Sequence, residues 1–153
     1  MSKRFLVWWG YTVELIAAAV VLLCLGLWFG SAEIVSFLRN AAIDIATLFS
    51  AVMFAASLGF LWSFYTKADT DFYRWLESKG AFAVYLHAAG FAVAVSFAST
   101  VTLVFLRHVD TVYFGLVTIY LLLLAVINLY SLVANVMGLM RLNAQFNHGK
   151  RDN

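Results

Sequence analysis

The sequence predicts an all-α, polytopic membrane protein with four transmembrane helices in one antiparallel bundle and both termini in the cytoplasm. Of its 153 residues, 64% are hydrophobic and 12% are charged, whereas a soluble domain carries about 25% charged residues. A soluble core of this size cannot enclose so much apolar surface, so lipid must cover it. Four apolar runs are each long enough for a span of about 20 residues, and the short segments between them favour antiparallel neighbours.

The first apolar run covers about 6–29 and follows Lys3 and Arg4. It has the general layout of a secretory signal, but it is longer than the apolar part of a signal and Glu14 interrupts it. We therefore expect a retained transmembrane helix. The one cysteine of the chain, Cys24, lies in this run. A single cysteine excludes an intramolecular disulfide and argues against a cysteine-based metal site.

The other spans are expected at about 41–64, 81–106 and 112–140, so that residues 1–153 form a single transmembrane domain. The chain contains no proline. We therefore expect uninterrupted helices rather than the broken helices that form binding sites in many transporters.

The charged segment 65–80 predicts a short amphipathic helix between the second and third spans. Asp69 or Thr70 is placed to cap its start, and Gly80 to end it. This helix either lies at the lipid headgroups or docks a cytoplasmic partner, and the polar tail 141–153 could add to either role. The side chains expected to form this surface are Phe72, Arg74, Trp75 and Lys79.

The distribution of basic residues predicts the orientation of the spans. Two of the ten lysines and arginines, Arg39 and Arg107, lie on one side of the predicted membrane. The other eight are Lys3, Arg4, Lys67, Arg74, Lys79, Arg141, Lys150 and Arg151. Because cytoplasmic loops carry an excess of lysine and arginine, the side with eight should be the cytoplasmic side of the inner membrane.

Four polar side chains, one from each span, fall at similar depth in the inner half of the predicted bundle: Glu14, Ser57, His87 and Asn135. At about 1.5 Å per residue, Glu14 lies roughly 12 Å and His87 roughly 9 Å from the cytoplasmic end. Ionisable groups inside a membrane usually face the bundle interior and pair. We expect a polar layer that either locks the bundle or responds to protons or ions; alternatively, Glu14 extends toward the cytoplasm.

The fourth span carries a polar row of Asn128, Ser131 and Asn135, followed by Gly138. Offsets of three, seven and ten place these residues on one helical face. An asparagine in a membrane needs a partner. The row therefore indicates either hydrogen bonds between helices or a hydrophilic lining.

At the outer end, Asp44 is expected to form an ion pair with Arg39 or Arg107, in a structural role. Small residues also recur at helical spacing, and in membranes such faces let helices approach closely. The second span has Thr47, Ala51, Ala55 and Gly59, and the third has Ala94, Ala98 and Thr102 on one face and Ala92, Ser96 and Ser99 on another. These stripes serve packing within the bundle, or association of several copies, for which the third span is the candidate.

The sequence lacks the patterns of catalytic and cofactor sites. Of its three histidines, His87 lies in a span, whereas His108 and His148 lie outside the spans. No glycine-rich phosphate loop and no metal-ligand spacing are present. We therefore expect a protein that is not an enzyme, holds no cofactor and contacts no nucleic acid.

The layout resembles small bacterial four-span membrane proteins of phage defence and superinfection exclusion, such as the Kiwa membrane subunit and RexB-like proteins. The features that carry the resemblance are four closely spaced spans, the charged inner loop Thr66–Gly80, and the polar end of the last span at Asn128–Ser131 and Arg141–Asn143. The resemblance implies a homo-oligomeric membrane component that senses or perturbs the membrane, together with a cytoplasmic partner.

Three functions are therefore consistent with the sequence. The first is a homo-oligomeric subunit of anti-phage defence that acts as sensor, scaffold or ion-conducting effector. The second is an accessory subunit of a transporter or respiratory complex. The third is an immunity protein that blocks a pore-forming toxin in the bilayer.

Overall fold

The computed structural model of the chain describes the backbone of residues 3–151 and the side chains of residues 11–148. The described residues form helices and no strand, which confirms the all-helical class. The elements are α1 (Lys3–Phe29), α2 (Ser31–Asp44), the π-helical segment η1 (Ile45–Ser50), α3 (Ala51–Lys67), α4 (Asp71–Ser78), α5 (Phe82–Leu106) and α6 (Val112–Arg151). Within residues 3–151, four helical runs are long and apolar enough to cross a membrane, as predicted.

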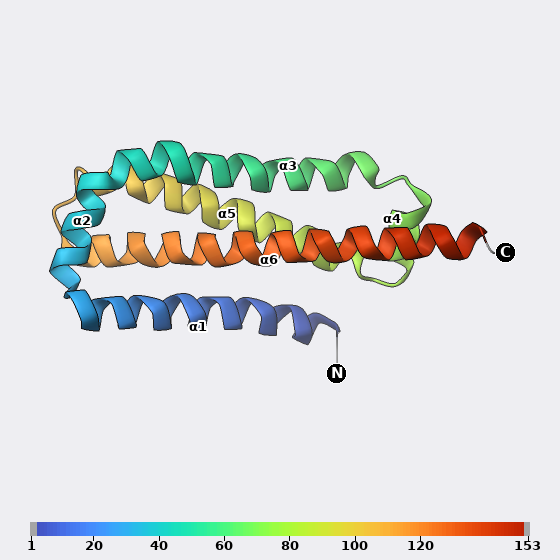
Figure 1. Cartoon of the computed structure of the whole chain (residues 1–153), viewed down its shortest axis with the longest axis horizontal. Helices are drawn as coiled ribbons and strands as arrows, with labels where there is room; N and C mark the ends of the chain where they lie inside the picture. The colour runs from blue at the N-terminus through green and yellow to red at the C-terminus, as the bar shows by residue number, and fades with distance from the viewer. Residues whose placement is uncertain (1–2, 152–153) are drawn as a thin grey trace.

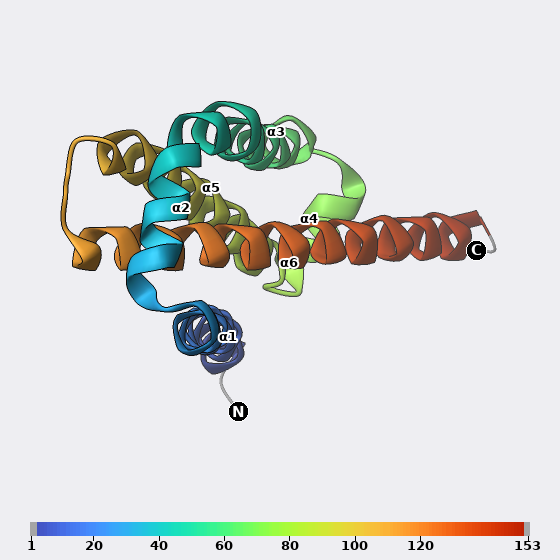
Figure 2. The same cartoon turned by 60° about the vertical axis from the view of Figure 1, so that its left-hand side comes forward.

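Four long helices, α1, α3, α5 and α6, lie along the long axis of the molecule, and the chain reverses its direction from each one to the next (Figure 1). Helix α6 lies between α1 on one side and the pair α3 and α5 on the other. Helix α2 lies across the ends of the long helices and carries the chain from α1, over α6, to α3 (Figures 1 and 2).

Helix α2 corrects the predicted start of the second span. The sequence predicted a connecting segment and then a span over 41–64, but helix already begins at Ser31 and first runs crosswise. The buried residues of α2 are Val35, Leu38 and Ala42. Their spacing of three and four gives α2 one apolar face toward the bundle end. The crosswise direction therefore follows from a one-sided apolar pattern, which differs from that of a helix surrounded by lipid.

The π-helical segment η1 overturns the expectation of uninterrupted helices. It joins α2 to α3 where the chain changes direction (Figure 1). The Thr47 hydroxyl donates a hydrogen bond to the Ile43 carbonyl at 2.8 Å and lies 3.3 Å from the Asp44 carbonyl. Hydroxyls that bond back to the preceding turn compete with the helical ladder and favour bends. The break in the regular helix at η1 thus coincides with Thr47, whereas such breaks often occur at a proline.

The short helix α4 begins and ends close to the predicted positions. Thr70 has extended backbone at the start, but its hydroxyl donates to the Lys67 carbonyl at 2.9 Å instead of capping the helix. At the other end, Gly80 has a φ of 68°, and the Ala81 N–H donates to the Leu76 carbonyl at 3.1 Å. This is the glycine termination that the sequence predicted.

Helix α6 continues through the segment that was expected to be a tail. It has 40 residues, about 60 Å at 1.5 Å per residue, which exceeds the roughly 30 Å of bilayer hydrocarbon. Its last turns pack against α4: the Phe146 ring lies 5.8 Å from that of Phe72 and 5.5 Å from that of Trp75. These ring contacts account for a helix that extends beyond the predicted end at residue 140.

Three apolar clusters form the core, and α6 contributes to each of them. Their buried residues include Val35, Leu38, Leu103, Leu106 and Ile119 at the α2 end, Ala18, Met53, Val95, Leu124 and Ala125 in the middle, and Phe64, Phe72, Leu76, Leu132 and Leu139 at the α4 end. The long helices are therefore joined along much of the length of α6.

Helix α2 packs tightly against α6 at Gly115. A Cβ atom built there would overlap the side chain of Val35. By contrast, a Cβ atom at Gly138, on the same helix, would meet nothing within 4 Å. The two glycines therefore differ in packing, although both lie inside α6.

We predict that Gly115→Ala lowers the thermal unfolding temperature of the purified protein in detergent, because overpacking costs about 1–3 kcal/mol. The matched control, Gly138→Ala, should leave the temperature unchanged or raise it, since alanine in an open helical position stabilises by about 0.4–1 kcal/mol. Equal effects of the two substitutions would contradict the tight contact between α2 and α6.

Candidate functional site

The four residues of the predicted polar layer differ in burial. Ser57 is fully buried, and its hydroxyl has no hydrogen-bond partner among the described residues. Glu14 is half-buried, with one carboxylate oxygen enclosed and similarly without a partner in the described chain. His87 and Asn135 are exposed on the molecular surface. No hydrogen bond or ion pair joins any two of these four side chains within the described part of the structure.

The register between α1 and α6 explains why Glu14 and Asn135 do not share a layer. The Tyr120 hydroxyl donates to the Leu15 carbonyl at 3.3 Å, which places these residues side by side. Asn135 lies fifteen residues further along α6, about 22 Å away at 1.5 Å per residue. The prediction of one layer was wrong because it aligned the cytoplasmic ends of spans 1 and 4, whereas α6 extends well past the start of α1 (Figure 1).

The polar row of the last span is buried at one end only. The buried Asn128 amide donates to the Leu124 carbonyl at 3.1 Å, within its own helix. Ser131 is half-buried and Asn135 is exposed. Within the described residues, the Asn128 amide thus bonds back to the preceding turn and forms no hydrogen bond between helices of the kind that the row predicted.

The outer ion pair forms with a different partner from the expected one. Arg39 pairs with Asp110, with 2.6 Å between Nη1 and Oδ1, and also donates to the Val109 carbonyl at 3.3 Å. Asp44 lies five residues after Arg39, about 140° around the helix at 3.6 residues per turn, and so points elsewhere. Arg107 and Asp44 are exposed, without an ion pair in the described chain. The observed pair ties α2 to the connection between α5 and α6.

The predicted partner or lipid surface of segment 65–80 is divided between two sides of α4. Phe72 is 5% exposed and packs into the cluster at the α4 end, and Trp75 is half-buried beside it. Arg74 and Lys79 are exposed. The apolar face of α4 is therefore covered by its own chain, chiefly by the unexpected continuation of α6. This corrects the assignment of Phe72 and Trp75 to an outward surface.

The small-residue stripes are also used differently from the expectation. On the third span, the face of Ala92, Ser96 and Ser99 is buried inside the molecule. On the second span, the whole stripe of Thr47, Ala51, Ala55 and Gly59 is exposed, and a Cβ atom at Gly59 would meet nothing within 4 Å. The other face of the third span is only partly covered, since Ala94 is exposed and Ala98 and Thr102 are half-buried. The stripe that is exposed in full is thus on the second span.

An apolar groove of about 790 Å³ includes Ala55 and Gly59, the half of this stripe nearer α4. Residues from α3 and from the start of α5 line it, among them Ala55, Leu58, Gly59, Trp62, Phe82 and Leu86. We call this groove with the exposed stripe the α3 face. Sequence reasoning found its small residues but missed the contribution of α5, because the register between two helices is not encoded in the periodicity of either one.

Neither a metal-ligand cluster nor a known relative points to another site. Among the described residues, no group of three or more His, Cys, Asp and Glu side chains is placed to hold a metal ion. No family model, curated protein or solved structure matches the chain.

We predict that Phe72→Ala destabilises the α4 end, because truncating a buried phenylalanine costs about 3–5 kcal/mol. The expected readout is faster proteolysis between α3 and α5 and a lower unfolding temperature. The matched control is Arg74→Ala on the exposed side of α4, where surface substitutions usually stay within about 0.5 kcal/mol. If Phe72→Ala were as stable as Arg74→Ala, Phe72 would instead face outward, as the sequence predicted.

Proposed function

We propose that this chain is a non-enzymatic subunit of the bacterial inner membrane that functions as a homo-oligomer, joined through the α3 face. The observation that carries the proposal is the exposure of the complete stripe Thr47, Ala51, Ala55 and Gly59 beside an apolar groove. The stripe allows close backbone approach, and the groove offers a recess for side chains from the approaching helix.

The physics of helix association in lipid supports this use of the face. Because lipid tails are as apolar as leucine, exposed apolar side chains alone provide no drive for association. Close van der Waals packing does, and small residues permit it. His87 is also exposed on α5, and ionisable side chains within membrane spans usually face protein or water. An exposed His87 is thus in keeping with a protein neighbour in the membrane, although it is not among the residues that line the groove.

The charge distribution supports an orientation with both termini in the cytoplasm. At the α4 end lie Lys67, Arg74, Lys79 and Arg141, whereas Arg39 and Arg107 lie at the α2 end. The positive-inside rule then assigns the α4 end to the cytoplasm. The side chains of Lys3, Arg4, Lys150 and Arg151, which entered the sequence prediction, are outside the described residues.

The role within the cell rests on the resemblance to four-span phage-defence proteins. We propose that the oligomer acts as a membrane sensor or scaffold in anti-phage defence, with a cytoplasmic partner recruited by the exposed Arg74, Lys79 and the end of α6. We favour this role over ion conduction, because the buried Asn128 amide donates within its own helix.

We predict that Gly59→Leu reduces the oligomer to monomer, because a bulky side chain keeps the approaching helix away. Native mass spectrometry in mild detergent measures the change. Gly26→Leu is the matched control, since Gly26 on α1 also has no neighbour within 4 Å of a Cβ atom but lies outside the α3 face. A wild-type monomer would contradict the proposal and favour the accessory-subunit alternative.

The defence role is tested by plating phage on cells that express the chain with its neighbouring genes. We expect fewer plaques with the wild type and with Gly26→Leu, and restored plating with Gly59→Leu. Equal plaque numbers with and without the wild-type chain would contradict the defence role. Oligomerisation is tested independently, by mass spectrometry.

A further inference from the structure

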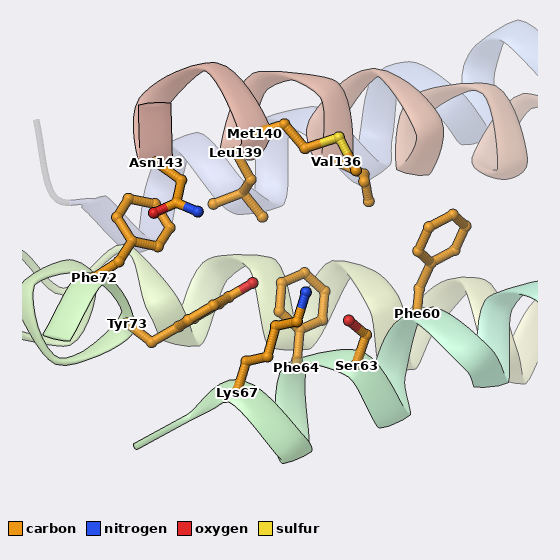
Figure 3. A pocket seen from close by; sticks show the side chains of 10 residues that line it. All are labelled: Phe60, Ser63, Phe64, Lys67, Phe72, Tyr73, Val136, Leu139, Met140 and Asn143. Carbon is orange, nitrogen blue, oxygen red and sulfur yellow. The ribbon is translucent and has the colours of Figure 1, made fainter. Parts of the chain in front are cut away.

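A second, smaller cavity lies at the α4 end, between α3, α4 and the late turns of α6 (Figure 3). Its volume is about 100 Å³, several times the space that one water molecule needs. It shares no lining residue with the groove of the α3 face. The cavity therefore is a separate feature with its own chemistry.

One part of this cavity is polar and carries a positive charge. Figure 3 shows the Lys67 ammonium, the Tyr73 hydroxyl and the Ser63 hydroxyl pointing toward the same space, with the Asn143 side chain facing it from α6. No aspartate or glutamate lines the cavity. Lys67 forms no ion pair within the described part of the chain. An ammonium and several potential donors without a carboxylate are suited to an anion.

Tyr73 is held in place for the role of donor. Its ring makes edge contacts with Phe64, Phe72 and Phe82, at centroid distances of 6.1, 5.3 and 5.8 Å. Burial raises the pKa of the Tyr73 phenol above its ordinary value. The hydroxyl therefore keeps its proton at neutral pH. It can donate a hydrogen bond to an anion instead of repelling it.

The other part of the cavity is apolar. Phe60, Val136 and Met140 form its wall one or two turns further toward the middle of the long helices (Figure 3). Lys67 is the last residue of α3, so the polar part lies where a membrane span ends. This order, charged at the span end and apolar toward its middle, matches the junction between headgroup and acyl chain in a lipid.

We propose that this cavity binds a phosphate group, with Lys67 as the charged ligand and Tyr73 and Ser63 as hydroxyl donors. The apolar wall favours a phospholipid as the source of the phosphate. Bound lipid would then fill the space between α3, α4 and α6 and link the assembled protein to the anionic lipid of its own leaflet.

The test compares lipid retention by the intact protein in native mass spectrometry. The probes are phosphatidylglycerol, which is anionic, phosphatidylcholine, which has no net charge, and inorganic phosphate at millimolar concentration. We expect preferential retention of phosphatidylglycerol. Lys67→Gln should weaken it about tenfold, as expected for the loss of one charge-assisted hydrogen bond. Tyr73→Phe keeps the ring contacts, removes only the donor, and should weaken retention by a smaller factor.

Arg74→Gln is the matched control, because it removes one positive charge from the same end without touching the cavity. Its effect should stay below about twofold, as for exposed charges. Displacement of the lipid by inorganic phosphate would support the phosphate site and identify a free anion as a competing source. Equal retention by wild type and Lys67→Gln, or equal losses with Lys67→Gln and Arg74→Gln, would overturn the proposal.

Discussion

The packing of every other helix onto α6 is the constraint on which the rest of the structure depends. Helices α1, α2, α3 and α5 all contact α6, and α4 contacts it through Phe146. In lipid, such packing must come from close fit, because apolar surface gains little by leaving one apolar medium for another. The tight approach at Gly115 and the buried small residues of α5, such as Ala92 and Ser99, provide that fit.

The central position of α6 also determines which surfaces remain. Since α6 lies between α1 and the pair α3 and α5, no other described helix lies on the outer side of α3 (Figure 2), where Thr47, Ala51, Ala55 and Gly59 are exposed. Its small residues are then available to another copy. The length of α6 has a second consequence, because its continuation past residue 140 covers α4 and adds Asn143 to the lining of the small cavity at Lys67 and Tyr73. The proposed oligomer surface and the proposed phosphate site thus both depend on the central position and the length of α6.

Much of the fold could be predicted from the sequence, because span length and hydropathy are local properties. The helical boundaries at Phe29, Leu106 and Val112 and the glycine end of α4 follow from residues close to them.

The candidate site was predicted less well. The layer of Glu14 and Asn135 failed because depth was counted from helix ends, whereas a contact between Tyr120 and Leu15 sets the register. The Arg39–Asp110 pair and the role of Asn143 likewise depend on tertiary placement.

The central claim, that the α3 face joins two copies of the chain, is tested most directly by oxidative cross-linking in native membranes. Cys24 is replaced by serine, and a single cysteine is introduced at Ala55 or, for comparison, at Ala134, an exposed position on α6. The account predicts a disulfide-linked dimer for the cysteine at position 55 and monomer for the one at 134. Monomer at both positions, or equal cross-linking at both, would contradict it.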